Sequence, residues 1–293
     1  MSELREIRSL IDQVTERLGP VSETPRLEAD LLVARAINMP RSYLFAHPED
    51  ELDDAALERL NGEVERRLDG EPLAYISGVR EFWSLELMVT RATLVPRPET
   101  EKLVELALAH VPRQEHSAVL DLGTGSGAIA CAIAWERRMA HVTGVDISRD
   151  AVAVAEQNAR QLDLDNLRFV QGSWTEPVRE LRYPLVVSNP PYVAANDPAL
   201  AALRWEPTDA LVAPDHGLGC IRTLAELVPG ILAEDGVFLF EHGADQQDAV
   251  GQILAATGWS DIETFPDLAG LPRVTRARRR RSPVVKPSPL YPS

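Results

Sequence analysis

The sequence predicts a mixed α/β fold in which a parallel sheet is covered by helices on both faces. From residue 118 onward, short apolar runs alternate with helix-like segments, as is typical of a doubly wound sheet. A glycine-rich turn follows the first run, at the place where such sheets bind ligands. The runs are AVLDL (118–122), HVTGVD (141–146), LRFVQ (167–171), LVVS (185–188) and VFLFE (237–241). Helices are expected between them, for example at Ala151–Leu162 and Arg222–Leu232.

The segment before residue 80 has the apolar spacing of helices. The first helix has its apolar residues at Ile7, Leu10, Ile11, Val14 and Leu18. It should end at Gly19-Pro20, a second helix should run from Leu27 to near Pro40, and a third should span Asp53–Leu68. These segments carry no cluster of catalytic residue types, so we expect a small helical bundle that recognises a partner.

The segment between this bundle and the sheet has a different pattern. Aromatic and β-branched residues alternate with polar ones between Phe82 and Val95, which predicts a β-hairpin.

Composition and charge limit the class of protein. The chain has 293 residues, enough for one large and one small domain, and 30 Lys and Arg against 45 Asp and Glu give a net charge of −15. An acidic surface repels phosphate backbones, so stable DNA binding is not expected. The sequence has no apolar run long enough for a membrane span and no signal-peptide core, which favours a cytoplasmic protein.

Only two cysteines occur, Cys131 and Cys220, and they lie far apart in the sequence. This argues against a disulfide framework and against a cysteine-based zinc site, and no metal is expected. One strongly basic run, RARRRR (276–281), precedes the proline-rich end SPVVKPSPLYPS. It is expected to be a disordered tail, with a contact to RNA or the ribosome as the alternative.

The turn after the first predicted strand is a candidate ligand site. Its residues are Gly123, Thr124, Gly125, Ser126 and Gly127. Glycines allow a sharp turn and let a ligand approach the backbone. The spacing is G-x-G-x-G, which differs from the G-x-G-x-x-G of dinucleotide-binding folds, and Asp121 would be unfavourable beside a pyrophosphate.

Two further residues indicate a nucleoside. Asp146 ends the second predicted strand, where a carboxylate can accept hydrogen bonds from ribose hydroxyls. Trp174, after the third strand, is suited to the edge of an adenine ring, although a packed aromatic is its simpler interpretation. A nucleoside without a pyrophosphate fits S-adenosylmethionine, and NAD is the weaker alternative.

The fourth predicted strand ends in Ser188-Asn189-Pro190-Pro191-Tyr192. The prolines fix the backbone, so that the Asn189 side-chain oxygen and the Pro190 carbonyl become two rigid acceptors. Two acceptors suit a planar –NH₂ group, and Tyr192 can stack on a conjugated group. Hydrogen bonds to both hydrogens would orient a poorly nucleophilic nitrogen toward a sulfonium methyl, so catalysis would rest on positioning.

The chain resembles the HemK/PrmC family of protein methyltransferases over nearly its whole length, to about Arg276. The resemblance rests on GEPLAYISGVREFW (70–83), LVPRPETE (94–101), DLGTGSG (121–127), SNPPY (188–192) and FEHG (240–243). It implies a class I S-adenosylmethionine-dependent, Rossmann-like domain preceded by a helical bundle and a hairpin linker. It also implies methylation of the side-chain amide of the glutamine in the Gly-Gly-Gln motif of peptide chain release factors.

The resemblance also implies roles for individual residues. The cofactor would contact Gly123, Thr124, Gly125, Ser126, Gly127, Asp146, Trp174 and Asn189. The glutamine would bind Asn189, Pro190, Pro191 and Tyr192, with Asn189, Pro190 and Tyr192 as the catalytic residues. The expected parts are a recognition domain (1–78), a linker (79–100), a methyltransferase domain (101–277) and a basic tail (278–293), acting as a monomer.

Other functions remain open at this point. Asn-Pro-Pro-Tyr also occurs in enzymes that methylate adenine or cytosine amines in nucleic acids, and a related group methylates a glutamine of a large-subunit ribosomal protein. PRPETE favours the release-factor branch. A binding module without turnover is a further alternative, against which the intact SNPPY and DLGTGSG motifs argue.

Overall fold

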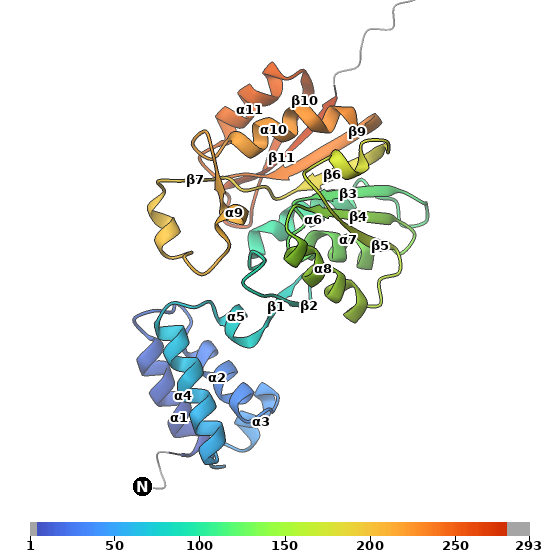
Figure 1. Ribbon diagram of the computed structural model, residues 1–293. Coiled ribbons are helices and arrows are strands. Elements are labelled where there is room, and N and C mark those ends of the chain that lie inside the picture. Colours follow the sequence, from blue (N-terminus) through green and yellow to red (C-terminus); the bar gives the residue numbers. More distant parts are fainter. Residues whose placement is uncertain (1–4, 280–293) are drawn as a thin grey trace, which may run out of the picture.

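The computed structural model describes residues 5–279 of the chain. A group of helices lies at the N-terminal end, and a sheet with helices on both faces makes up the larger part, with a short hairpin between them (Figure 1). Within the described residues, no helix has both the length and the apolar character needed to cross a membrane.

The N-terminal part is a bundle of amphipathic helices. They are α1 (Ile7–Leu18), α2 (Pro25–Ala36), α3 (Arg41–Ala46), α4 (Asp54–Leu68) and α5 (Leu73–Ser77). The apolar positions of α1, α2 and α4 meet in one core that includes Leu10, Leu32 and Leu60. Asp53 caps α4, because its carboxylate accepts the N–H of Ala56 at 2.7 Å. The three expected helices are present, whereas α3 and α5 are too short to show a helical period in the sequence.

The linker hairpin consists of β1 (Val79–Phe82) and β2 (Leu85–Met88), which pair antiparallel. Its turn residues, Trp83 and Ser84, have positive φ angles of 54° and 57°. Such two-residue turns usually contain Asn or Gly, so the sequence gives no signal for this one. The hairpin predicted between Phe82 and Val95 is therefore wrong in position, because both strands end by Met88.

A seven-stranded sheet forms the centre of the larger part. Its strands are β3 (Ala118–Leu122), β4 (His141–Asp146), β5 (Leu167–Gln171), β6 (Tyr183–Ser188), β9 (Leu232–Glu241), β10 (Trp259–Pro266) and β11 (Pro272–Arg279). The strand order is β10-β11-β9-β6-β3-β4-β5, in which β11 is antiparallel to both neighbours and the other pairs are parallel. The five predicted strands are all present.

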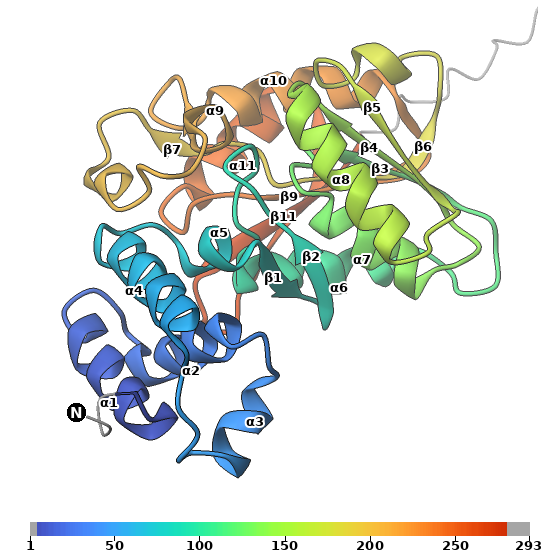
Figure 2. The same ribbon diagram turned by 60° about the horizontal axis from the view of Figure 1, so that its bottom comes forward.

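Helices cover both faces of this sheet, as Figures 1 and 2 show. One face packs against α6 (Glu101–Leu108), α7 (Ala128–Glu136) and α8 (Arg149–Gln161). The other packs against α10 (Gly219–Leu227) and α11 (Gln247–Ala256). The doubly wound arrangement predicted from the sequence is therefore confirmed.

Short elements complete the loops. They are η1 (Pro98–Thr100), η2 (Glu176–Val178), η3 (Pro198–Ala201), η4 (Val228–Gly230), α9 (Thr208–Leu211), β7 (Val193–Ala194) and β8 (Val212–Ala213). Strands β7 and β8 pair parallel, so they hold together the two ends of the long segment between them.

Two predicted boundaries are wrong. The helix expected at Arg222–Leu232 ends at Leu227, because Pro229 lies in the 3₁₀ turn that follows and Leu232 already begins β9. The basic run 276–281 was expected to be disordered, and the tail was expected to start at residue 278. The run instead begins inside a strand. Arg276–Arg279 belong to β11, where Ala277 is buried in the core and Arg276 pairs with Glu263 on β10. Residues 280–293 lie outside the described part of the chain.

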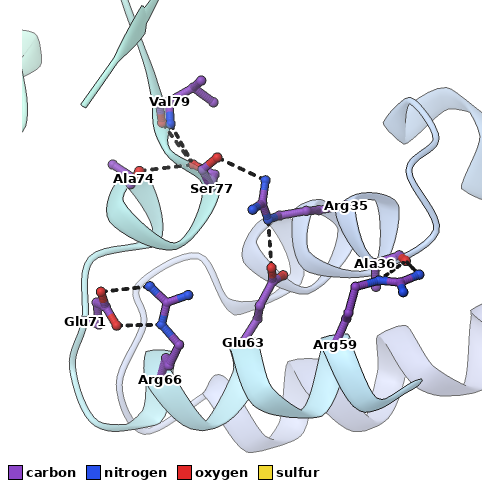
Figure 3. Close-up of polar contacts among 9 residues, drawn as sticks. All are labelled: Arg35, Ala36, Arg59, Glu63, Arg66, Glu71, Ala74, Ser77 and Val79. Atoms are coloured by element: carbon purple, nitrogen blue, oxygen red, sulfur yellow. Dashed lines mark hydrogen bonds and ion pairs between the residues drawn. The ribbon is translucent and has the colours of Figure 1, made fainter. Parts of the chain in front are cut away.

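Ion pairs of Glu71 attach the helical bundle to the linker, and Figure 3 shows the pair with Arg66. Glu71, only 1% exposed, accepts two hydrogen bonds from the Arg66 guanidinium at 2.7 and 2.9 Å, and one from Arg91 at 2.9 Å. These partners lower the pKa of Glu71 to about 2, so its carboxylate is ionised at neutral pH. Arg35 on α2 donates to both Glu63 and the Ser77 carbonyl, joining α2 and α4 to the end of α5.

One buried amide joins the linker to the sheet. Asn158 on α8 is fully buried, and its Oδ1 accepts the N–H of Met88 at 2.7 Å. Its Nδ2 donates to the carbonyls of Met88 at 3.0 Å and Ser126 at 2.8 Å. This side chain therefore holds the hairpin strand β2 against both α8 and the glycine turn.

We predict that Asn158→Ala lowers the free energy of unfolding by about 3 kcal/mol, because buried backbone groups lose their partners. Urea denaturation followed by circular dichroism measures the change. Asn61→Ala, at an exposed position of α4, is the matched control and should stay within about 0.5 kcal/mol of the unaltered chain. Equal stability of the two variants would contradict the bridging role.

Candidate active site

Three parallel strands end at one edge of the sheet and bring distant residues together. Leu122, the last residue of β3, is level with Val145 on β4 and with Ser188 on β6. The glycine turn, Asp146 and Asn189 follow directly, so they gather at this edge although the sequence separates them. This is the edge at which doubly wound sheets bind ligands.

The turn between β3 and α7 depends on glycine. Gly123, Gly125 and Gly127 have φ angles of 71°, 56° and 80°, in the left-handed region that other residues rarely adopt. The N–H groups of Gly123 and Thr124 donate to the Val145 carbonyl at 2.8 and 3.0 Å, which holds the turn against β4. A side chain on Gly127 would also lie 2.9 Å from the Phe169 ring.

Asp121 lies beneath this turn and is fully buried. Its Oδ2 accepts the hydroxyl of Thr124 at 2.6 Å, whereas its Oδ1 has no partner among the described residues. Burial raises the pKa of Asp121 to about 7, and the nearby Asp146 adds to the rise. Its hydrogen bond with Thr124 supports the turn from beneath.

Asp146 at the end of β4 is held by backbone groups. Its Oδ2 accepts the N–H of Gly125 at 2.8 Å, and its Oδ1 accepts the N–H of Ser148 at 2.9 Å. Burial raises the pKa of this carboxyl, and the backbone donors oppose the rise. Because a carboxylate oxygen can accept more than one hydrogen bond, Asp146 can still accept bonds from a ligand.

A cavity of about 540 Å³ opens at this edge, within the size range of small-molecule sites. Of the residues singled out in the sequence, its wall contains Gly123, Thr124, Gly125, Ser126, Asp146, Trp174, Asn189 and Pro191. Gly127, Pro190 and Tyr192 are not part of this wall. Gly127 is the N-cap of α7, Pro190 is buried, and the Tyr192 ring packs against the core under α10 and α11.

Trp174 has two environments. Its ring lines the cavity and also contacts the core beside α10 and α11, so it is a packed aromatic, and its contact with an adenine ring stays a prediction. Its backbone has a φ angle of 46°, unusual for a residue other than glycine, which places the ring beside Gly123.

A chain of side-chain hydrogen bonds leads away from Asn189. Its Nδ2 donates to Thr100 Oγ1 at 3.2 Å, and the Thr100 hydroxyl donates to Glu241 Oε2 at 2.6 Å. The Tyr192 hydroxyl donates to the other Glu241 oxygen at 3.0 Å. Glu241 is 1% exposed, and burial raises its pKa, while the two hydroxyl donors and Arg273 oppose the rise.

Thr100 and Glu241 are site residues that were not predicted from the sequence. Both lie in quoted motifs, PRPETE and FEHG, and Glu241 is a charged residue at the end of an apolar strand. A charge in that position is unusual and could have identified it as a site residue.

A distant glutamate holds the linker over the cavity. Glu206 is 6% exposed and accepts the N–H of Val95 at 3.0 Å and a hydrogen bond from Arg97. The linker and the segment around α9 therefore form one cover, and both contribute residues to the cavity wall. No local pattern reveals Glu206, because its partners lie 109 and 111 residues away in the sequence.

Two family models match the chain. Residues 9–78 match the PrmC N-terminal domain, and residues 113–256 match a methyltransferase domain. Among solved structures, a methyltransferase from Pyrococcus furiosus aligns with a TM-score of 0.51 at 16% identity, covering 74% of this chain and 97% of that one. The methyltransferase domain of METTL16 aligns with a TM-score of 0.51 at 13% identity, covering 68% and 90%. These likenesses concern the fold, and they confirm the predicted class I methyltransferase architecture.

Curated relatives are much closer in sequence. The release factor glutamine methyltransferase of Coxiella burnetii is 42% identical over 93% of this chain and 99% of its own length. Those of Vibrio cholerae and Escherichia coli are 45% and 42% identical, over 92% and 88% of this chain and 95% and 93% of theirs. The resemblance noted in the sequence is thereby confirmed, and the chain belongs to the family of release factor glutamine methyltransferases.

Proposed function

We propose that this protein transfers a methyl group from S-adenosylmethionine to the side-chain amide nitrogen of the glutamine in the Gly-Gly-Gln motif of class 1 peptide chain release factors. The observation that carries the proposal is the carboxamide of Asn189 in the cavity wall. The carboxamide nitrogen donates a hydrogen bond to Thr100, whereas no donor among residues 5–279 forms a hydrogen bond to the carboxamide oxygen. The names of the curated relatives support the choice of substrate.

The residues around the cavity fit the cofactor, which would supply a methyl group on a sulfonium. Asp146 would accept hydrogen bonds from its ribose hydroxyls, and the glycine turn would let it approach the backbone. Thr124, Ser126 and Trp174 would complete its contacts. Two carboxyl groups at one edge disfavour a pyrophosphate, which argues against NAD.

The substrate amide would bind at the end of β6. The Asn189 side-chain oxygen and the Pro190 carbonyl would each accept one hydrogen of the glutamine –NH₂ group, while Pro191 fixes the backbone. Both hydrogen bonds would orient the nitrogen lone pair and raise its electron density. The new N–C bond would form as the methyl leaves sulfur, and the amide nitrogen would release its proton to water. Tyr192, expected from the sequence to stack on the amide, packs against the core instead, and its hydroxyl holds Glu241.

We propose further that the helical part, residues 1–78, binds the release factor, and that residues 79–100 link it to the catalytic part, which begins at 101. The contacts of Glu71 and Glu206 support this arrangement, because they hold bundle, linker and cavity cover together. The protein would act as a monomer in the cytoplasm, without a metal and without stable binding to DNA.

The first prediction concerns the substrate. With labelled S-adenosylmethionine, and with a purified release factor, a large-subunit ribosomal protein and DNA offered side by side, the label should enter only the release factor. Mass spectrometry should place one methyl on the Gly-Gly-Gln glutamine, and a release factor with alanine there should stay unlabelled. Label found only in DNA or in the ribosomal protein would overturn the choice of substrate.

The second prediction concerns the acceptor of the substrate amide. Asn189→Ala should lower the rate of methyl transfer about 1000-fold, because the amide nitrogen loses an oriented hydrogen bond in the transition state. Calorimetry should still detect cofactor binding, although it should be weaker. Full activity of this variant would exclude the two-acceptor mechanism.

The third prediction concerns the cofactor. Asp146→Ala should weaken S-adenosylmethionine binding about 10-fold to 100-fold, because hydrogen bonds to a charged acceptor are lost. Asp150→Ala, at an exposed position in the first turn of α8, is the matched control and should bind the cofactor normally. Equal affinity of the two variants would remove Asp146 from the site.

A further inference from the structure

Two buried residues, Thr100 and Glu241, are linked to the Asn189 side chain by hydrogen bonds, and of these two Thr100 shares the cavity wall with Asn189. Thr100 comes from η1, before α6, and Glu241 from the end of β9, so two separate elements meet behind Asn189. Thr100 and Glu241 are 4% and 1% exposed. The hydrogen bonds from Asn189 to Thr100 and from Thr100 to Glu241 measure 3.2 and 2.6 Å.

The direction of these hydrogen bonds follows from the chemistry of the groups. In its ionised form, which the two hydroxyl donors and Arg273 favour, the Glu241 carboxylate can only accept, and it accepts one hydroxyl on each oxygen, from Thr100 and from Tyr192. A hydroxyl has a single hydrogen, so Thr100, having donated it to Glu241, can only accept from Asn189. The –NH₂ of Asn189 must then face Thr100, and its oxygen must face the other way.

This direction matters because the two ends of a carboxamide have nearly the same shape. An asparagine that turns by half a rotation presents two donors in place of an acceptor. An acceptor at this position binds the –NH₂ of a glutamine, whereas donors would bind a carboxylate equally well. Shape alone does not fix the orientation of Asn189, so a polar partner must do it.

We infer that Thr100 and Glu241 are positioning residues that set the orientation of the Asn189 carboxamide and thereby select a glutamine amide over a glutamate carboxylate. The inference rests on the proposed function, since it assumes that an amide binds at Asn189. It adds that the preference for an amide comes from Thr100, beside Asn189 in the cavity wall, and from Glu241, which is not part of that wall. Glu241 acts through Thr100, and Thr100 acts through Asn189.

Thr100→Val tests the inference most directly, because it removes the hydroxyl and keeps the shape. We expect kcat to fall about 30-fold, since Asn189 loses its fixed orientation, while the KM for S-adenosylmethionine stays within about twofold. Thr100→Ser keeps the hydroxyl and should restore kcat to within about threefold of the original. A serine variant as poor as the valine variant would show that the methyl group matters, and would overturn the inference.

Binding selectivity separates an orienting role from a merely structural one, because a structural role alone would not change the preference between the two forms of the substrate. The probes are a release factor with Gly-Gly-Gln and its variant with Gly-Gly-Glu. The unaltered protein should prefer the glutamine form, and the preference should fall at least about 10-fold in Thr100→Val. Glu241→Gln should lower it too, because its new –NH₂ can donate to Thr100 and reverse the chain of hydrogen bonds. An unchanged preference in Thr100→Val would overturn the inference.

A third measurement needs no substrate. The side-chain –NH₂ signals of Asn189, assigned by their loss in Asn189→Ala, should be protected from hydrogen exchange in the original protein and in Thr100→Ser. They should lose protection in Thr100→Val, and equal protection in all three would contradict the inference. If the –NH₂ signals behave as expected but no release factor is methylated, the proposed substrate fails and the orienting role stands.

Discussion

The parallel pairing of β3 with β4 on one side and β6 on the other is the constraint on which the rest of the site depends. Parallel strands end at a common edge, so the residues at their ends lie close together. The glycine turn follows β3, Asp146 is the last residue of β4, and Asn189 follows β6. The hydrogen bonds from the turn to the Val145 carbonyl then fix the distance between the first two. The sheet thus supplies the precision that loops alone would lack.

Three acidic side chains lie at or near this edge in a largely apolar setting. Burial raises the pKa of Asp121, Asp146 and Glu241, and in each case hydrogen-bond donors oppose that effect. The donors also fix the geometry of each carboxyl group. Backbone N–H groups hold Asp146, and two hydroxyls hold Glu241. Asp121 accepts the Thr124 hydroxyl beneath the glycine turn.

Charged contacts hold the linker between the helical bundle and the sheet. Glu71 receives Arg66 from the bundle and Arg91 from the linker, whereas Glu206 receives Arg97 from the linker. Trp205 lies next to Glu206, and its ring packs against the Arg91 guanidinium at 4.3 Å. These contacts connect the two glutamates through the linker. The bundle, the linker and the segment around Glu206 are therefore joined by one series of contacts.

The sequence by itself determined the succession of strands and helices along the chain, the glycine turn and the residues at the strand ends. Buried parallel strands are continuous apolar runs, and the turn needs glycine at three positions, so both leave a local signal. The family resemblance carried by DLGTGSG and SNPPY was likewise readable without coordinates. The hairpin turn at Trp83-Ser84 left no such signal, and the first arginines of the basic run proved to be part of β11.

Only the tertiary structure decided which side chains meet. Thr100 and Glu241 lie 141 residues apart, and Asn158 and Met88 lie 70 apart, yet both pairs are joined by hydrogen bonds of 3.0 Å or less. Such contacts depend on how helices and loops pack on the finished sheet, and no local pattern encodes them. The sequence therefore predicted that Asn189 would face a ligand. The direction in which its carboxamide faces was decided by Thr100 and Glu241 behind it, because only folding places a hydroxyl and a buried carboxylate there.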